Sequence, residues 1–251
     1  MKVTPEILRR IEHLHVRAWP ALEAKSVEGW LWRYSGGGSQ RANSVSTIDF
    51  GGGDVEAALD EVEASYRERG VPARLQSFSA GRPTSLPELL SRRGYRQGEA
   101  TITMAKPVER RQEVANVEVG GQATPEWLDV YLGAIAENRR EVNTLILRAV
   151  PEPRAFFAYR HDGRVVSTAL CVAEPDAAED GCAVIECVAT RQDVRRQGGA
   201  RAVLAAIEAF AHGRHVRLLG LQVSASNAPA LALYGSLGFA AVDHNRFWVR
   251  D

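Results

Sequence analysis

Cysteine is scarce in this sequence, which has only three among its 251 residues. No CxxC pair occurs, so neither a disulfide framework nor a redox motif is indicated, and we expect buried, reduced thiols. The histidine pairs His13/His15 and His212/His215 have no carboxylate or thiol beside them in the sequence that would complete a ligand set. We therefore expect no metal site. The three cysteines are Cys171, Cys182 and Cys187.

Net charge is also absent, because 31 Lys and Arg residues balance 31 Asp and Glu residues. A neutral chain gives no general reason to bind nucleic acid or an anionic membrane, and we expect neither partner. No apolar run reaches the roughly 20 residues that a membrane-spanning helix needs. Charged residues interrupt the first apolar positions, unlike those of a signal peptide. The expected location is cytoplasmic.

The composition that remains is that of an ordinary folded protein, with 45% hydrophobic and 25% charged residues. The length allows one large domain or two small ones. Helical spacing of apolar residues predicts helices over 4–18, 54–69, 86–93, 125–137, 141–149, 200–212 and 229–237. Strand-like runs occupy 29–34, 41–48, 73–79, 100–106, 154–159, 164–172, 183–190, 217–223 and 242–250. This mixture predicts an α+β fold.

The two halves of the chain repeat each other. The pattern is a helix, a strand, a shorter helix that ends at glycine, and a final strand. It places LPELLSRRGY (86–95) on ALALYGSLGF (230–239). The repeat favours two similar domains, over 1–107 and 117–251, joined by the polar linker 108–116. The alternative is that both halves are ordinary βαβαβ segments with a glycine helix stop.

The most informative stretch is a basic turn between strand 183–190 and helix 200–212. A strand that ends in such a turn and restarts as a helix exposes several backbone N–H groups. The helix dipole and two arginines add positive potential. These features predict a site for a phosphate-bearing ligand, although a tight turn with incidental arginines would have the same sequence. The turn reads Arg195-Arg196-Gln197-Gly198-Gly199-Ala200.

Arg195-x-x-Gly198-x-Ala200 resembles the acyl-CoA signature Q/R-x-x-G-x-G/A of the GCN5-related N-acetyltransferases. One helix and one strand further on, NAPALALYGSLGF (227–239) is similar to that family's N-x-x-A-x-x-L-Y-x-x-x-G-F. The resemblance covers about 117–251, and the first half looks like the degenerate amino-terminal domain of tandem members. It implies two tandem domains, each a mixed, mostly antiparallel sheet flanked by helices, with catalysis in the second.

The resemblance also implies acetyl-CoA as the cosubstrate. The N–H groups from Arg196 to Ala200 would hold its pyrophosphate, and backbone groups at Val188 and Thr190 would pair with its pantetheine arm. The N–H of Val188 is the candidate oxyanion donor. Tyr234 would lie near the coenzyme A sulfur and protonate the leaving thiolate. Its alternative role is that of a core tyrosine.

Two further site residues keep alternative roles. Asn227 lies two helical turns before Tyr234, and it either binds the pantetheine or caps the helix. Glu186 is the one carboxylate in an apolar strand, and a period of two places it on the same face as Val188 and Thr190. Apolar neighbours are expected to raise its pKa and make it the general base. The alternative is a strand residue that faces solvent.

The first half lacks these features. Leu90 stands where Tyr234 stands, Pro83 stands where Asn227 stands, and 50–54 (FGGGD) replaces the basic turn. We expect this half not to bind coenzyme A.

The predicted activity is direct acetyl transfer to an amine of a small-molecule or peptide acceptor, by a monomer or homodimer. The alternatives are a non-catalytic acyl-CoA-binding sensor and a donor with a longer acyl chain.

Overall fold

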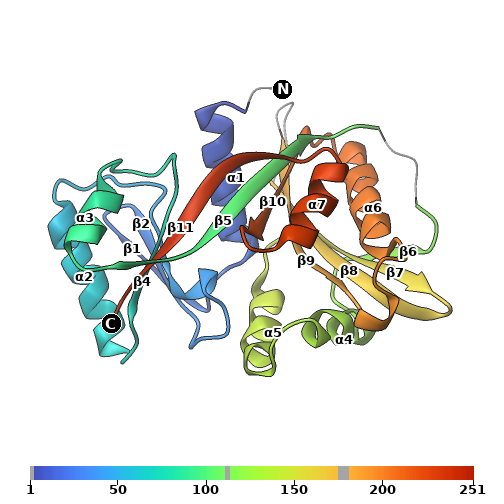
Figure 1. Ribbon diagram of the computed structural model, residues 1–251, viewed down its shortest axis with the longest axis horizontal. Coiled ribbons are helices and arrows are strands. Elements are labelled where there is room, and N and C mark those ends of the chain that lie inside the picture. The colour runs from blue at the N-terminus through green and yellow to red at the C-terminus, as the bar shows by residue number, and fades with distance from the viewer. Residues whose placement is uncertain (1–2, 111–113, 175–180) are drawn as a thin grey trace.

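The computed structural model describes residues 3–110, 114–174 and 181–251; part of the expected linker, 111–113, lies outside them. Figure 1 shows one continuous twisted sheet with helices on both faces. The first half contributes α1 (Pro5–Ala18), β1 (Glu23–Val27), β2 (Trp30–Tyr34), a 3₁₀ turn (Arg41–Asn43), β3 (Val45–Ser46), α2 (Val55–Glu68), β4 (Ala73–Ser77), α3 (Leu86–Arg92) and β5 (Arg96–Pro107).

The second half runs through a comparable series of elements. They are β6 (Val117–Gly120), α4 (Pro125–Gly133), a 3₁₀ turn (Glu137–Arg139), α5 (Arg140–Ala149), β7 (Arg154–His161), β8 (Arg164–Ala173), β9 (Cys182–Thr190), a 3₁₀ turn (Gln192–Val194), α6 (Gly199–Gly213), β10 (Leu218–Ser224), α7 (Ala228–Ser236) and β11 (Ala240–Arg250). Each of the seven predicted helices is present. Among the described residues, none of the helices has the length and apolarity needed to cross a bilayer.

One predicted strand is largely wrong. The segment 41–48 forms a 3₁₀ turn followed by a strand of only two residues. The cause is the Asn43 side chain, which accepts hydrogen bonds from the backbone of Ser35 and Gly37 and donates to the carbonyls of Gly37 and Ser39. These bonds fold the loop 35–43 back on itself instead of leaving it extended.

The strand order is β1-β2-β3-β4-β11-β5-β10-β9-β8-β7-β6. From each side toward the centre the pairing repeats: β4 lies parallel to β3 and antiparallel to β11, and β10 lies parallel to β9 and antiparallel to β5. The last strand of each half therefore lies in the sheet of the other half, and the two long strands cross the molecule side by side (Figure 1). The predicted α+β class, with a mixed, mostly antiparallel sheet, is confirmed. The division at 107 separates the two halves along the chain, but β5 and β11 each pair with strands of the other half.

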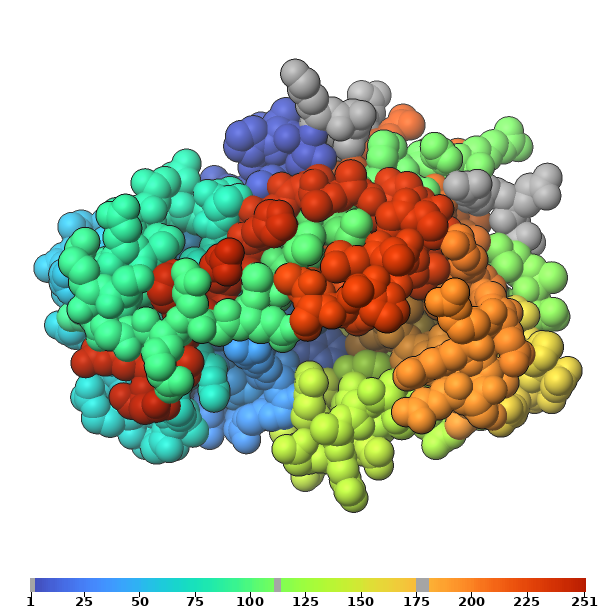
Figure 2. All heavy atoms as spheres, viewed as in Figure 1, coloured from blue at the N-terminus to red at the C-terminus, as the bar shows by residue number. Residues whose placement is uncertain are grey.

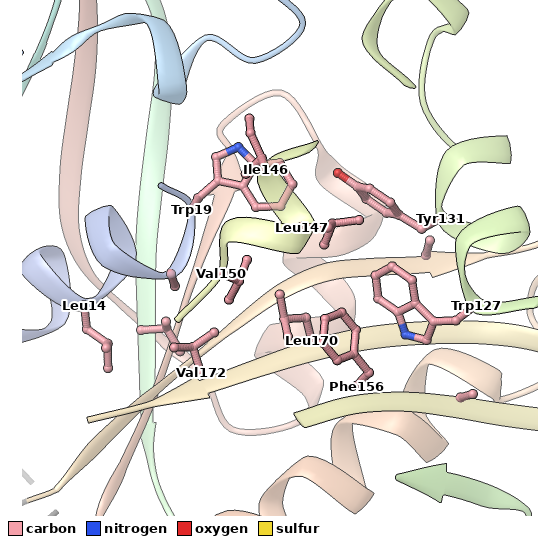
Figure 3. Packing of buried hydrophobic residues seen from close by; sticks show 14 of the residues in the cluster. Leu14, Trp19, Trp127, Tyr131, Ile146, Leu147, Val150, Phe156, Leu170 and Val172 are labelled. Atoms are coloured by element: carbon pink, nitrogen blue, oxygen red, sulfur yellow. The ribbon is translucent and has the colours of Figure 1, made fainter. Parts of the chain in front are cut away.

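Three apolar cores hold the helices on the sheet. One lies under α2 and α3 and includes Trp30 and Trp32, which are core residues. A second lies under α6 and α7. The third lies under α4 and α5, and it also takes Leu14 and Trp19 from the first helix and the residue that follows it (Figure 3). Helix α1 thus packs on β8, β9 and β10 of the second half, where its polar residues can reach the middle of the sheet.

Candidate active site

A cleft opens where two parallel strands separate. Strands β9 and β10 pair from Cys182–Leu218 to Ile185–Leu221 and no further. The cleft beyond this point has a volume of about 770 Å³. Figure 2 shows the hollow between β11 and α7 on one side and α5 on the other. Its lining includes Gly37–Arg41, Tyr131, Arg139, Glu186–Val188, Gln222, Asn227 and Tyr234.

Strand β9 carries a β-bulge at the edge of this cleft. Its pairing with β8 gains a residue after Glu186, so Cys187 and Val188 both lie opposite Ala169. Cys187 has φ of 55°, a left-handed conformation that is rare for residues other than glycine. The extra residue reverses the alternation: Glu186 points toward α1, whereas Val188 packs with the core under α6. The predicted common face for Glu186, Val188 and Thr190 is therefore wrong.

Glu186 is held by an arginine and a histidine from the first half of the chain. Arg41 donates from Nη1 to Oε1 at 2.8 Å and from Nη2 to Oε2 at 2.6 Å, and His15 Nδ1 lies 3.1 Å from Oε1. Burial alone would raise the pKa of Glu186, but Arg41 and then His15 outweigh it and lower the pKa to about 2. The expectation of a raised pKa is wrong, and so is the solvent-facing alternative, because the side chain is 7% exposed.

A buried polar network continues from this ion pair across the sheet. Arg41 donates to Gln222 Oε1 at 3.4 Å, and Gln222 Nε2 donates to Glu12 Oε2 at 2.7 Å. Thr103 donates to Glu12 Oε1 at 2.5 Å. Burial, followed by smaller contributions that include the charge of Asp243, raises the pKa of Glu12 to about 8. The described residues contain no group of three or more His, Cys, Asp or Glu side chains that could hold a metal ion.

Glu12→Gln should remove a pH dependence of stability. The pKa of Glu12 is about 8 in the folded chain against an ordinary 4.5, so only the folded state binds this proton between those values. Stability therefore falls as pH rises through this window, by at most about 1.4 kcal/mol per pH unit. Urea unfolding at pH 6.5, 7.2 and 8 should show this slope in the wild type and a flatter one in the variant. The contribution of His15, whose pKa is lowered by burial, is common to both proteins and cancels when their slopes are compared. Parallel slopes would contradict the prediction.

Tyr234 is a core tyrosine that also lines the cleft, and its role as a proton donor stays a prediction. It is 8% exposed in the core under α6 and α7, packs edge-to-face on Phe239 with ring centroids 6.0 Å apart, and lines the cleft. Burial and then the charge of Glu186 raise the pKa of its phenol to about 12. The hydroxyl therefore keeps its proton at every physiological pH, as a proton donor must.

Asn227 caps helix α7. Its Oδ1 accepts a hydrogen bond from the backbone N–H of Ala230 at 3.2 Å, and Pro229 lies in the first turn. The capping role is confirmed. Asn227 also lines the cleft together with Tyr234, seven residues further on, as their helical spacing predicts. A contact between Asn227 and a pantetheine arm stays a prediction.

The basic turn ends in a helix N-terminus without a side-chain cap. Helix α6 starts after Gly198, which has φ of 88°, and no acidic residue lies in its first turn. Within the described chain, Arg195 donates to the carbonyl of Gln192 and Ala202 donates to that of Gly198, which leaves the N–H groups from 196 to 201 without a backbone acceptor. The N–H groups predicted to bind an anion thus lie together at one helix terminus, where residues 195–198 are exposed.

The turn packs closely on the sheet but does not line the cleft. A Cβ added at Gly199 would lie 2.5 Å from Ser167 Oγ on β8, so only glycine allows this approach. Ser167 in turn bonds the Thr190 hydroxyl at 2.6 Å. Thr190 and the turn therefore lie together, while Glu186, Val188, Asn227 and Tyr234 meet in the cleft.

The first half fills the equivalent helix terminus with its own carboxylate. Asp54 caps α2, and its Oδ1 accepts from the N–H groups of Glu56 at 2.9 Å and Ala57 at 3.1 Å. Leu90, the counterpart of Tyr234, is fully buried in the core. An anion would meet negative charge here instead of open N–H groups.

The fold is that of the GCN5-related N-acetyltransferases among solved structures. Among solved structures, a GCN5-related N-acetyltransferase from Kribbella flavida is 17% identical and covers 97% of this chain and 95% of its own, with a TM-score of 0.70. A tandem GNAT protein from the clavulanic acid biosynthesis pathway covers 77% of this chain and 68% of its own, with 14% identity and a TM-score of 0.59.

Sequence comparison agrees with the fold. The "Uncharacterized N-acetyltransferase YobR" of Bacillus subtilis (strain 168) is 24% identical over 253 residues, covering 97% of this chain and 98% of that protein. The family model described as "Probable histone acetyltransferase Rv0428c C-terminal" matches residues 4–248. The chain belongs to this acetyltransferase family, within the GCN5-related superfamily that its two motifs implied.

Proposed function

We propose that the protein transfers an acetyl group from acetyl-CoA directly to an amine. The observation that carries this proposal is a single cleft lined by Val188, Asn227 and Tyr234, which come from two elements on either side of the strand separation. The second half, 117–251, supplies these groups and the basic turn. The first half, 1–107, binds no coenzyme A in this proposal, because Asp54 occupies its equivalent helix terminus.

The cofactor binds along the end of β9 in this proposal. The open N–H groups at the start of α6 bind the pyrophosphate, with Arg195, Arg196 and Gln197 beside it. The pantetheine arm enters between β9 and β10 and pairs with backbone groups of Val188 and Thr190. The N–H of Val188 then faces the thioester carbonyl and stabilises the oxyanion that forms there.

The chemical step follows from the protonation states of the site. A neutral amine attacks the thioester carbonyl, the C–N bond forms, and the C–S bond breaks as Tyr234 donates its proton to the thiolate. A carboxylate with a pKa of about 2 is a poor proton acceptor, so we assign the amine proton to water in the cleft. Glu186 acts as a fixed negative charge on the cleft wall. No covalent acyl-enzyme is needed.

Release of coenzyme A from acetyl-CoA in the presence of an amine panel tests this function. The panel should contain amino acids, small polyamines, aminoglycosides and peptides with free N-termini, and mass spectrometry should identify the acetylated product. We expect turnover above hydrolysis for at least one class. Tight acetyl-CoA binding without turnover on any amine would favour the sensor instead. Parallel assays with longer acyl-CoA thioesters test the donor.

A further inference from the structure

Two side chains from the first half of the chain converge on one residue of the active-site strand. His15 and Arg41 are 1% and 23% exposed, and both bind the Glu186 carboxylate, which is itself 7% exposed. They come from α1 and from the 3₁₀ turn after β2, segments that are not adjacent in the chain. Glu186 directly precedes the bulge residue Cys187, and Val188 follows. The contact therefore lies within two residues of the proposed oxyanion donor.

We propose that Arg41 and His15 are positioning residues of the active site. They hold Glu186 and thereby fix the β9 bulge that presents the Val188 N–H to the thioester. The first half of the chain thus completes the catalytic site of the second half. This inference rests on the proposed function.

The bulge needs such support because its backbone is unfavourable by itself. A cysteine at φ of 55° persists only where its surroundings impose that conformation. Glu186 supplies an anchor directly before this residue through three short contacts. An oxyanion donor is effective only within a narrow range of position. A loosened bulge therefore weakens catalysis without removing the cofactor site.

Arg41 is itself held rigidly. Its guanidinium lies 5.6 Å from the centroid of the Trp19 ring and donates to Gln222. The second half anchors the loop that carries it, because Asn143 Nδ2 and Arg139 Nε donate to the Gly38 carbonyl at 3.0 and 2.7 Å. A side chain fixed by its own neighbours can fix another one.

The charge of Glu186 depends mainly on Arg41. Burial opposes ionisation, and Arg41 is the largest influence that favours it. Without Arg41 the carboxylate would keep only the imidazole of His15 as a partner, and its pKa would rise. The titratable groups around Glu186 are His15 from α1, Arg41 from the 3₁₀ turn, Tyr131 from α4, Cys187 from β9 and Tyr234 from α7, with Glu12 of α1 acting through Arg41.

The test compares Arg41→Gln, Arg41→Lys and the control Arg92→Gln, an exposed arginine of α3 outside the cleft. We expect kcat of Arg41→Gln to fall at least tenfold while the Kd for acetyl-CoA stays within threefold. The ratio of its kcat to that of the wild type should fall further as pH drops from 8 to 5, because Glu186 becomes protonated only in the variant, whereas protonation of the amine acceptor affects both proteins alike. Arg41→Lys should recover part of the loss, and Arg92→Gln should match the wild type.

A double variant separates positioning from a general structural effect. If Arg41 acts through Glu186, Arg41→Gln/Glu186→Gln should lose no more activity than the worse single variant. Additive losses, or wild-type kcat and pH profile in a folded Arg41→Gln, would overturn the inference. Should Arg41→Gln fail to fold, His15→Gln with the same double-variant comparison decides the question. A wild type that turns over no amine rejects the proposed function and this inference together, whereas turnover unaffected by Arg41 rejects only the inference.

Discussion

Ala200→Asp is expected to abolish measurable acetyl-CoA binding at micromolar concentrations while the protein stays folded. The new carboxylate would lie in the first turn of α6, beside the N–H groups proposed to hold the pyrophosphate. Two like charges about 5 Å apart repel by about 3 kcal/mol at an effective dielectric constant of about 20, which corresponds to at least a hundredfold loss of affinity. The first half already has a carboxylate at the equivalent position, since Asp54 caps the start of α2.

The Ala200→Asp variant distinguishes lost binding from lost stability, because the carboxylate should weaken acetyl-CoA binding but stabilise helix α6. An acidic residue in the first turn stabilises a helix, by about 0.3–1 kcal/mol, so the thermal midpoint should not fall. Ala200→Asn, of the same size without the charge, is the matched control and should bind within a few-fold of the wild type. Isothermal titration calorimetry with acetyl-CoA measures the affinity of both variants, and thermal unfolding measures their stability. Equal affinity for the Asp and Asn variants would rule out a pyrophosphate at this helix terminus.

Tyr234→Phe should lower kcat by about 10²–10⁴-fold with little change in acetyl-CoA affinity. The substitution removes only the hydroxyl, and the ring can keep its edge-to-face packing on Phe239. Because the pKa of the wild-type phenol is about 12, this group should not limit wild-type activity as pH rises to 10. The thiolate of the variant must instead take its proton from water.

The measurement is the steady-state release of coenzyme A with the acceptor found in the amine panel. Tyr34→Phe is a suitable control, because Tyr34 lies on β2 in the first half, outside the cleft. A Tyr234→Phe variant with unchanged kcat would remove the tyrosine from the chemical step. A loss confined to the KM for acetyl-CoA would make Tyr234 a binding residue instead.

The parts of the site that sequence reasoning found are local in the chain. The basic turn is a strand end followed directly by a helix start, so its glycines and arginines specify its open N–H groups without help from distant residues. Asn227 and Tyr234 lie on one short helix, whose period fixes their common side. The predicted helices are likewise present, because an apolar stripe and a helix cap are both encoded within about a dozen neighbouring residues.

The parts that sequence reasoning missed depend on distant contacts. The bulge at Cys187 inverts the alternation of β9, and no glycine marks it. The pKa of Glu186 is decided by Arg41 and His15, which are separated from it by 145 and 171 positions. Chain spacing could not reveal these pairs. The one available signal was the presence of Arg41 and Asn43 after the glycines 36–38, because a simple β-hairpin needs neither residue.

The exchange of final strands determines the order in which the strands can pair during synthesis. Strand β5 pairs only with β10 and β11, among the residues the structure describes, so it has no sheet partner until nearly the whole chain has been synthesised. During synthesis, the first half emerges with its last strand unpaired. Strand β11 later pairs with both β4 and β5, which completes the sheet of the first half. Such long-range pairing is slow and leaves strand edges exposed to aggregation meanwhile. Pairing of β11 with β4 and β5 is thus the step that lets both halves complete their sheets together.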